Sequence, residues 1–190
     1  MLTLFMEMSP SQSGRQDDMI ETCITNIAQG DKDALSLLYE QTHTAVDGFA
    51  LSILKNKEDA EDALHDTYIH IWKAAGSYTP AGKPLDWIFT ITRNLARMRL
   101  REQTRTVAVS PDDCQNMFVE EPAVDHEDRI ILASLLGTLS DEERQIVVLH
   151  AMTGLKHREI ADLLGLALPT VLSKYSRALK KLRTALKEAD

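Results

Sequence analysis

The stretch Leu155–Leu186 constrains the fold more than any other part of this chain, because it predicts two short helices joined by a tight turn. Apolar residues recur at helical spacing in its first half, and Gly165 suits the left-handed conformation that ends many helices. Pro169 fits the first turn of a second helix, where its missing N–H costs nothing. The pattern predicts a helix-turn-helix.

The second of these helices has an apolar face and a polar, basic face, because its side chains repeat at about 3.6 residues per turn. The apolar stripe consists of Val171, Tyr175, Ala178, Leu179, Leu182 and Leu186. The opposite face carries Thr170, Ser173, Lys174, Arg177 and Lys181. A basic helix held in this way has the shape that enters a DNA major groove. An amphipathic surface helix with a solvated charged face is the simpler alternative.

The distribution of charge supports nucleic acid although the net charge is −8. Residues 73–102 carry six bases and two acids, and residues 128–190 carry ten bases and eight acids. The acidic excess lies elsewhere, in residues 1–72 and 103–127. Because salt screens distant charges, a phosphate responds mainly to the two local basic segments.

The periodicity predicts an all-α fold with two small helical domains joined by a flexible linker. We expect helices at about 17–28, 33–55, 57–76, 84–104, 127–137 and 141–152, followed by the helix-turn-helix. Ser140 and Glu143 predict a capping box at the start of the helix near 141. The predicted organisation is a disordered tail at 1–16, a domain at 17–104, an acidic linker at 105–126 and a second domain at 127–190.

The helix near 84–104 carries a second basic row. Arg93, Arg97 and Arg101 follow an i, i+4, i+8 spacing and stack along one face, which Asn94 shares. Such a row follows a phosphate backbone, and an exposed Trp87 could stack on an unpaired base. A core position for Trp87 is equally compatible with the sequence.

Acidic residues crowd the helix near 57–76, whose predicted core side is Ala60, Leu64, Tyr68, Ile71 and Ala75. Carboxylates in a first turn are favoured by the helix dipole. Asp59, Asp62 and Asp66 continue along the outer face, which also suits docking to a basic partner. The sequence leaves both interpretations open.

Motifs for catalysis, cofactors and metals are absent, so we expect no catalytic residue, no cofactor site and no metal site. Asp31 and Asp33 begin like a calcium loop, but the required Gly and Glu are missing. Cys23 and Cys114 form no CxxC pair, which favours reduced thiols and a cytoplasmic location. The sequence contains no run of 18 apolar residues, so it predicts no membrane-spanning helix.

Three segments together resemble the small extracytoplasmic-function (ECF) sigma factors of bacterial RNA polymerase. They are KNKEDAEDALHDTYIHIWKA (55–74), LDWIFTITRNLARMRLR (85–101) and LSDEERQIVVLHAMTGLKHREIADLLGLALPTVLSKYSRALKKLR (139–183). The first two resemble region 2 of that family and the third resembles region 4. With the intervening helices, the resemblance covers nearly all of residues 31–187.

The resemblance implies three sets of contacts. Core RNA polymerase, through its beta and beta-prime subunits, would be bound by Asp59, Ala60, Glu61, Asp62, Asp66 and Tyr68. The −10 promoter element would be contacted by Lys83, Trp87, Arg93, Asn94, Arg97 and Arg101. The −35 element would be contacted by Pro169, Thr170, Val171, Ser173, Lys174, Arg177 and Lys181. It further implies promoter melting and control by an anti-sigma factor.

Three positions depart from the family pattern in the recognition helix. The usual Gly-Thr-Val-Lys-Ser-Arg is replaced by Pro169-Thr-Val-Leu-Ser-Lys174. Leu172 removes a cation, and Lys174 lacks the planar fork with which Arg binds guanine. We therefore expect a changed −35 preference rather than a loss of DNA binding.

Two other functions compete with a sigma factor. A sigma-mimicking decoy would sequester an anti-sigma factor without productive promoter binding, but it need not keep a basic recognition helix. An ordinary helix-turn-helix activator would not need the acidic and Trp-containing segments. The sigma-factor interpretation also requires that internal partners do not neutralise Arg93, Arg97, Lys174 and Arg177.

Overall fold

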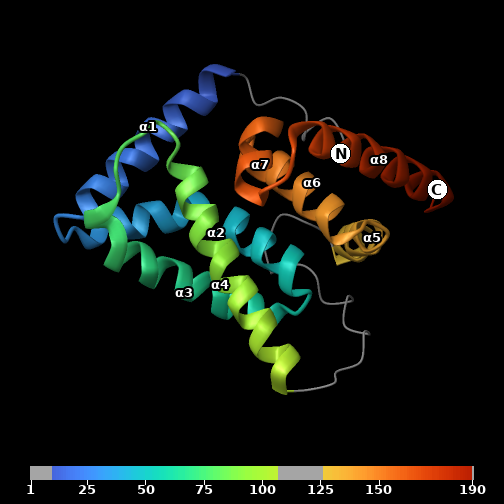
Figure 1. Ribbon diagram of the computed structural model, residues 1–190, viewed down its shortest axis with the longest axis horizontal. Coiled ribbons are helices and arrows are strands. Elements are labelled where there is room, and N and C mark those ends of the chain that lie inside the picture. The colour runs from blue at the N-terminus through green and yellow to red at the C-terminus, as the bar shows by residue number, and fades with distance from the viewer. Residues whose placement is uncertain (1–9, 107–125, 190) are drawn as a thin grey trace.

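The computed structural model describes residues 10–106 and 126–189, and within these ranges it contains eight α-helices, one 3-10 turn and no strand. The helices are α1 (Pro10–Ile27), α2 (Lys32–Leu54), α3 (Lys57–Ala74), α4 (Pro84–Thr106), α5 (His126–Gly137), α6 (Asp141–Thr153), α7 (His157–Leu164) and α8 (Leu168–Ala189), and the turn is Ala75–Ser77 (Figure 1). The predicted all-α class is confirmed. None of these helices is both long and apolar enough to span a bilayer.

Local capping groups explain where several helices begin and end. Ser140 and Glu143 form the predicted reciprocal capping box at the start of α6. Gly165 has a φ of +68° and ends α7 as predicted, because its missing side chain permits this conformation. The helix α8 begins at Leu168, which places Pro169 in its first turn.

The start of α1 differs from the prediction. The sequence suggested a loose tail through residue 16, but the helix begins at Pro10. Ile20 and Ile24 are fully buried against the following helices, and a helix anchored in this way extends at little cost per added residue. Residues 1–9 and 107–125, which include Cys114 and most of the predicted tail and linker, lie outside the described residues.

The helices α1–α4 form one bundle around α2, which packs against the other three. Phe49 of α2 and Phe89 of α4 meet edge to face in its core, with ring centroids 5.5 Å apart. In α5–α8, Ile146, Ile160 and Val171 are fully buried and join three helices of the helix-turn-helix unit. This arrangement fixes α4 and α8 as rigid supports for their exposed faces.

The two groups of helices also pack against each other through α2 with α6 and α4 with α7. A Cβ atom added at Gly48 of α2 would lie 2.7 Å from Sδ of Met152 on α6, so the absence of a side chain permits this close approach. Lys55 Nζ lies 2.7 Å from Asp141 Oδ1 across the same contact. The buried residues of both groups consequently form one continuous cluster.

Candidate nucleic-acid and polymerase interfaces

The polar face of α8 is mostly exposed, as the helical period predicts. Ser173, Arg177 and Lys181 face solvent, and Thr170 and Lys174 are half-buried. Val171 is fully buried in the core, so its side chain cannot contact a base, contrary to its place among the predicted −35 residues. The polar residues around it form the candidate duplex-binding face.

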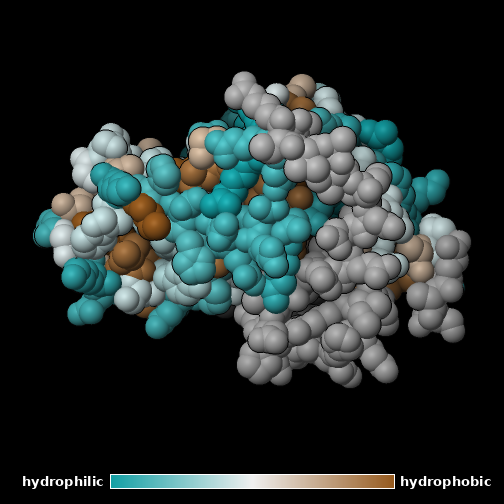
Figure 2. All heavy atoms as spheres, turned by 90° about the horizontal axis from the view of Figure 1, so that it is seen from below, coloured by the Kyte–Doolittle hydropathy of each residue, from teal (hydrophilic) through white to brown (hydrophobic). Residues whose placement is uncertain are grey.

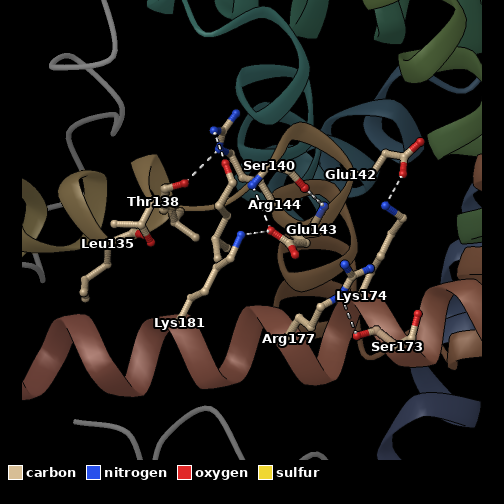
Figure 3. A network of polar contacts seen from close by, with 12 residues as sticks. Leu135, Thr138, Ser140, Glu142, Glu143, Arg144, Ser173, Lys174, Arg177 and Lys181 are labelled. Atoms are coloured by element: carbon tan, nitrogen blue, oxygen red, sulfur yellow. Dashed lines mark hydrogen bonds and ion pairs between the residues drawn. The ribbon is translucent and has the colours of Figure 1, made fainter.

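Two lysines of this face pair with acids in the first turn of α6 (Figure 3). Lys174 Nζ lies 2.7 Å from Glu142 Oε2, and Lys181 Nζ lies 2.7 Å from Glu143 Oε2. Arg177 instead donates from Nε to the carbonyl of Ser173 in its own helix. Within the described ranges, Arg177 has no acidic partner and keeps its charge for an external ligand.

Glu143 holds a structural position beneath this face, because it is almost fully buried. Burial alone would raise the pKa of its carboxyl, but hydrogen bonds from Lys181 and Ser140 outweigh that effect and hold the pKa at about 2. The same carboxylate accepts the backbone N–H of Ser140 at 3.0 Å. Glu143 therefore serves both the helix cap and the attachment of α8.

The second basic row lies on α4, but its members differ in surroundings. Arg97, Arg101 and Asn94 are exposed. Arg93 is half-buried and donates from Nη2 to the carbonyl of Leu164, at the end of α7, over 2.6 Å. Burial and the like charge of Arg97 lower the pKa of Arg93. In this conformation the helix-turn-helix unit covers part of the candidate −10 surface.

An open cavity of about 400 Å³ lies between α4 and α6. Arg93 and Arg97 line one side of it, and Asp141 and Glu142 of α6 line the other. Of the four cations that the prediction requires to be available, only Lys174 is paired with an acid among the described residues. Arg93 is occupied by a carbonyl, which leaves its charge uncompensated.

The other two predicted −10 residues lie at the start of α4. Trp87 is half-buried and packs against Tyr78 at a centroid distance of 4.9 Å, so it has both core contacts and an accessible part. Lys83 Nζ lies 3.7 Å from Asp86 and 4.0 Å from Glu159 of α7. Lys83 therefore lies next to both helix groups.

The aspartates of α3 form more hydrogen bonds within the protein than the sequence suggests. Ala60 and Tyr68 are buried, so their side chains cannot form a docking surface, contrary to the predicted role. Arg99 of α4 donates to Asp62 at 2.9 Å and to Asp66 at 2.6 Å, and Gln103 donates to Asp59. The three aspartates hence face a second helix as well as solvent.

Four polar residues contact the predicted sites although the sequence did not predict these contacts. They are Arg99, Gln103, Glu142 and Glu143, the last of which was predicted only as a capping residue. Arg99 falls off the i, i+4 row of the other arginines, and the i, i+4 aspartates of α3 offered a matching pair of carboxylates. This match of charges could have predicted the contacts of Arg99 from the sequence. The pairs between α6 and α8 could not be predicted in this way, because they depend on tertiary packing.

On the face drawn in Figure 2, exposed apolar side chains show at several places, one of which is the end formed by α1, α2 and α3. The large ones are Leu37, Tyr39, Ile69, Met98, Leu100 and Leu172. The first three lie on α2 and α3, the second of which carries the candidate polymerase-binding aspartates. Among the described residues, no group of three potential ligands could hold a metal ion.

Each half of the chain matches a known protein family. Sigma-70 region 2 matches residues 38–106, and Sigma-70 region 4 matches residues 129–182. A protein of Mycobacterium ulcerans (strain Agy99) named ECF RNA polymerase sigma factor SigK is 29% identical over 181 residues, covering 91% of this chain and 96% of the relative. A protein of the same name from Mycobacterium sp. (strain KMS) is 28% identical over 176 residues, covering 88% and 90%.

Two solved structures have a similar fold. The sigma factor RpoE, bound to the anti-sigma factor NepR from Bartonella quintana, superposes with a TM-score of 0.64 at 26% identity and covers 83% of this chain and 98% of that one. CnrH, in complex with the cytosolic domain of CnrY, gives a TM-score of 0.62 at 26% identity and covers 90% and 99%. The chain therefore belongs to the sigma-70 family and, within it, to the extracytoplasmic-function sigma factors.

Proposed function

We propose that this ECF sigma factor binds core RNA polymerase in the cytoplasm, recognises −10 and −35 promoter elements and promotes DNA melting. The observation that supports it most is the placement of two basic rows on separate helices, Arg93, Arg97 and Arg101 on α4 and Lys174, Arg177 and Lys181 on α8. The row on α4 lies within the residues that match Sigma-70 region 2, and the row on α8 lies within those that match region 4.

Binding energy rather than catalysis would drive melting. Unstacking a base costs a few kcal/mol, and stacking on an aromatic ring returns about 1–3 kcal/mol per base. The accessible part of Trp87 supplies such a ring, and Arg97 and Arg101 are exposed further along the same helix for backbone phosphates. Duplex contacts of α8 would add affinity without needing an opened strand.

Promoter binding would require the two helix groups to separate. Elements about 25 base pairs apart lie about 85 Å from each other at about 3.4 Å per pair. In the structure, Arg93 and Leu164, which belong to the two groups, lie within hydrogen-bond distance. A connecting segment of about 22 residues spans at most about 75 Å, so the domains themselves would cover the remaining distance.

An anti-sigma factor is the proposed regulatory partner. Both similar solved structures are complexes, and one of them is a sigma factor with an anti-sigma factor. A protein that stabilises the packed arrangement of α4 against α7 would keep Arg93 away from DNA. Beta and beta-prime subunits of the polymerase would instead bind the acidic side of α3.

Run-off transcription tests this function. The full chain is added to core polymerase with a panel of promoter templates, and specific transcripts are expected that core polymerase alone does not make. Core binding without any transcript, or neither activity, would favour the alternative of a decoy that sequesters an anti-sigma factor. The basic face of α8 favours the sigma factor over that decoy.

A further inference from the structure

The contact between α6 and α8 contains two acid–lysine pairs that differ in accessibility (Figure 3). The Glu143 side chain is 4% exposed, whereas the Glu142 side chain is 49% exposed. The side chain of Lys174, which pairs with Glu142, is 21% exposed. The Glu142–Lys174 pair thus lies at the rim of the candidate duplex-binding face, where a DNA strand can reach it.

A paired lysine contributes differently to DNA binding from an unpaired one. Each phosphate contact of a cation releases counterions and adds about 0.9 to the slope of log affinity against log salt. Glu142 offers Lys174 an ion pair at 2.7 Å without any DNA. The carboxylate of Glu142 repels a phosphate that approaches Lys174, so Glu142 opposes unspecific backbone binding by this lysine.

The pair retains donors and an acceptor for a base pair. One carboxylate oxygen of Glu142 accepts from Lys174, which leaves the other oxygen and two ammonium protons. In the major groove, a G·C pair presents guanine O6 and N7 as acceptors beside the cytosine N4 donor. An ammonium next to a carboxylate matches this pattern.

We propose that Glu142 is a specificity residue for duplex recognition: it holds Lys174 against α6, and the two side chains read one G·C pair together. This inference rests on the proposed −35 contact of α8. It assigns to Glu142 a selectivity that the lone lysine, lacking the planar fork of arginine, would not supply.

Salt-dependent duplex binding by the full chain tests the proposal. Fluorescence anisotropy with a short labelled duplex of mixed sequence is measured over a potassium chloride series for the parent and for Glu142→Gln. We expect the variant to have a steeper slope by about 0.9, which is about a threefold greater loss of affinity for a fourfold rise in salt. Glu40→Gln is the matched control, because Glu40 is exposed on α2 and the same charge is removed away from α8.

Equal slopes for the parent and Glu142→Gln would overturn the proposal. A double-mutant cycle with Lys174→Met separates a direct effect from one through the lysine. In the Lys174→Met background, Glu142→Gln is expected to leave the slope unchanged. A change as large as in the parent would show that Glu142 acts as a bare charge, and it would also overturn the proposal.

Selection from a randomised duplex library supplies a readout that a purely structural role would not change. We expect the parent to enrich a G·C pair at one position and Glu142→Gln to lose that preference. An undiminished preference in the variant would overturn the joint reading. A parent that binds no duplex would overturn the −35 contact itself, so the two failures are distinguishable.

Discussion

At the scale of single residues, Arg99 connects the two helices that carry the candidate polymerase and −10 contacts. Its two terminal nitrogens reach Asp62 and Asp66, and its side chain is only 22% exposed. These hydrogen bonds raise the pKa of Arg99. Without this cation, neighbouring carboxylates on α3 would repel one another, so Arg99 stabilises the acidic surface as well as the bundle.

Arg99→Ala is expected to lower the free energy of unfolding by about 1 kcal/mol, because charge-assisted hydrogen bonds to two carboxylates are lost. Arg99→Lys keeps the charge but cannot span both acids, so it should recover less than half of the loss. Urea unfolding measures both. Arg158→Ala serves as the control on an exposed arginine of α7, and an equal loss in that control would contradict the role of Arg99.

Asp47 introduces a pH dependence of stability. It is buried, and its Oδ1 has no hydrogen-bond partner among the described residues. Burial, followed by the charge of Glu61, raises the pKa of Asp47 to about 6. Since the folded state then holds this proton more tightly than the unfolded state, the contribution of Asp47 to stability falls as pH rises from about 4 to about 6.

Asp47→Asn should therefore raise the free energy of unfolding, relative to the parent, by more at pH 7 than at pH 4. After allowance for solvent screening, we expect this gain to differ by about 1–2 kcal/mol between the two pH values. Urea unfolding at several pH values measures the difference between parent and variant. A difference that stays constant from about pH 4 to about pH 7 would contradict the raised pKa.

At the scale of elements, the first turn of α6 joins three parts of the molecule. Asp141 pairs with Lys55, which follows the last residue of α2, while Glu142 and Glu143 pair with lysines of α8. These three consecutive acids also complement the positive end of the helix dipole. Any loss of order in this turn would weaken the attachment of α8.

Ser140→Ala removes the side-chain half of the α6 capping box and should cost about 1 kcal/mol of stability. Ser140→Thr retains the hydroxyl oxygen and should stay close to the parent. Thermal unfolding followed by circular dichroism distinguishes the two. A loss of equal size in both variants would mean that the cap is not the cause.

The extent of most elements could be predicted because caps and periodicity are local properties. Ser140, Glu143 and Gly165 mark the bounds of α6 and α7 within a few residues of chain. Burial of Ala60 and Val171 was also implied by their position on apolar faces, although the family resemblance placed them among contact residues. The first turns of α1 were missed, because their sequence has no apolar repeat of its own.

At the scale of the whole molecule, the packing of α6 on α2 and of α7 on α4 could not be predicted. It joins residues far apart in the chain, such as Arg93 and Leu164, and it depends on the small size of Gly48 rather than on a motif. Each candidate surface was visible in the sequence, but the contact of Arg93 with the end of α7 was not. The proposed promoter binding would consequently depend on the stability of this contact.

Gly48→Leu tests whether this contact controls access to the candidate −10 surface. A side chain at position 48 would collide with Met152, and overpacking of this kind costs about 1–3 kcal/mol. We expect the two helix groups to separate, which small-angle scattering detects as a larger radius of gyration, and we expect tighter binding of single-stranded DNA. Gly76→Leu is the control, since a Cβ there meets no atom within 4 Å. If Gly48→Leu keeps the radius of gyration of the parent, Met152 has moved aside and the contact persists.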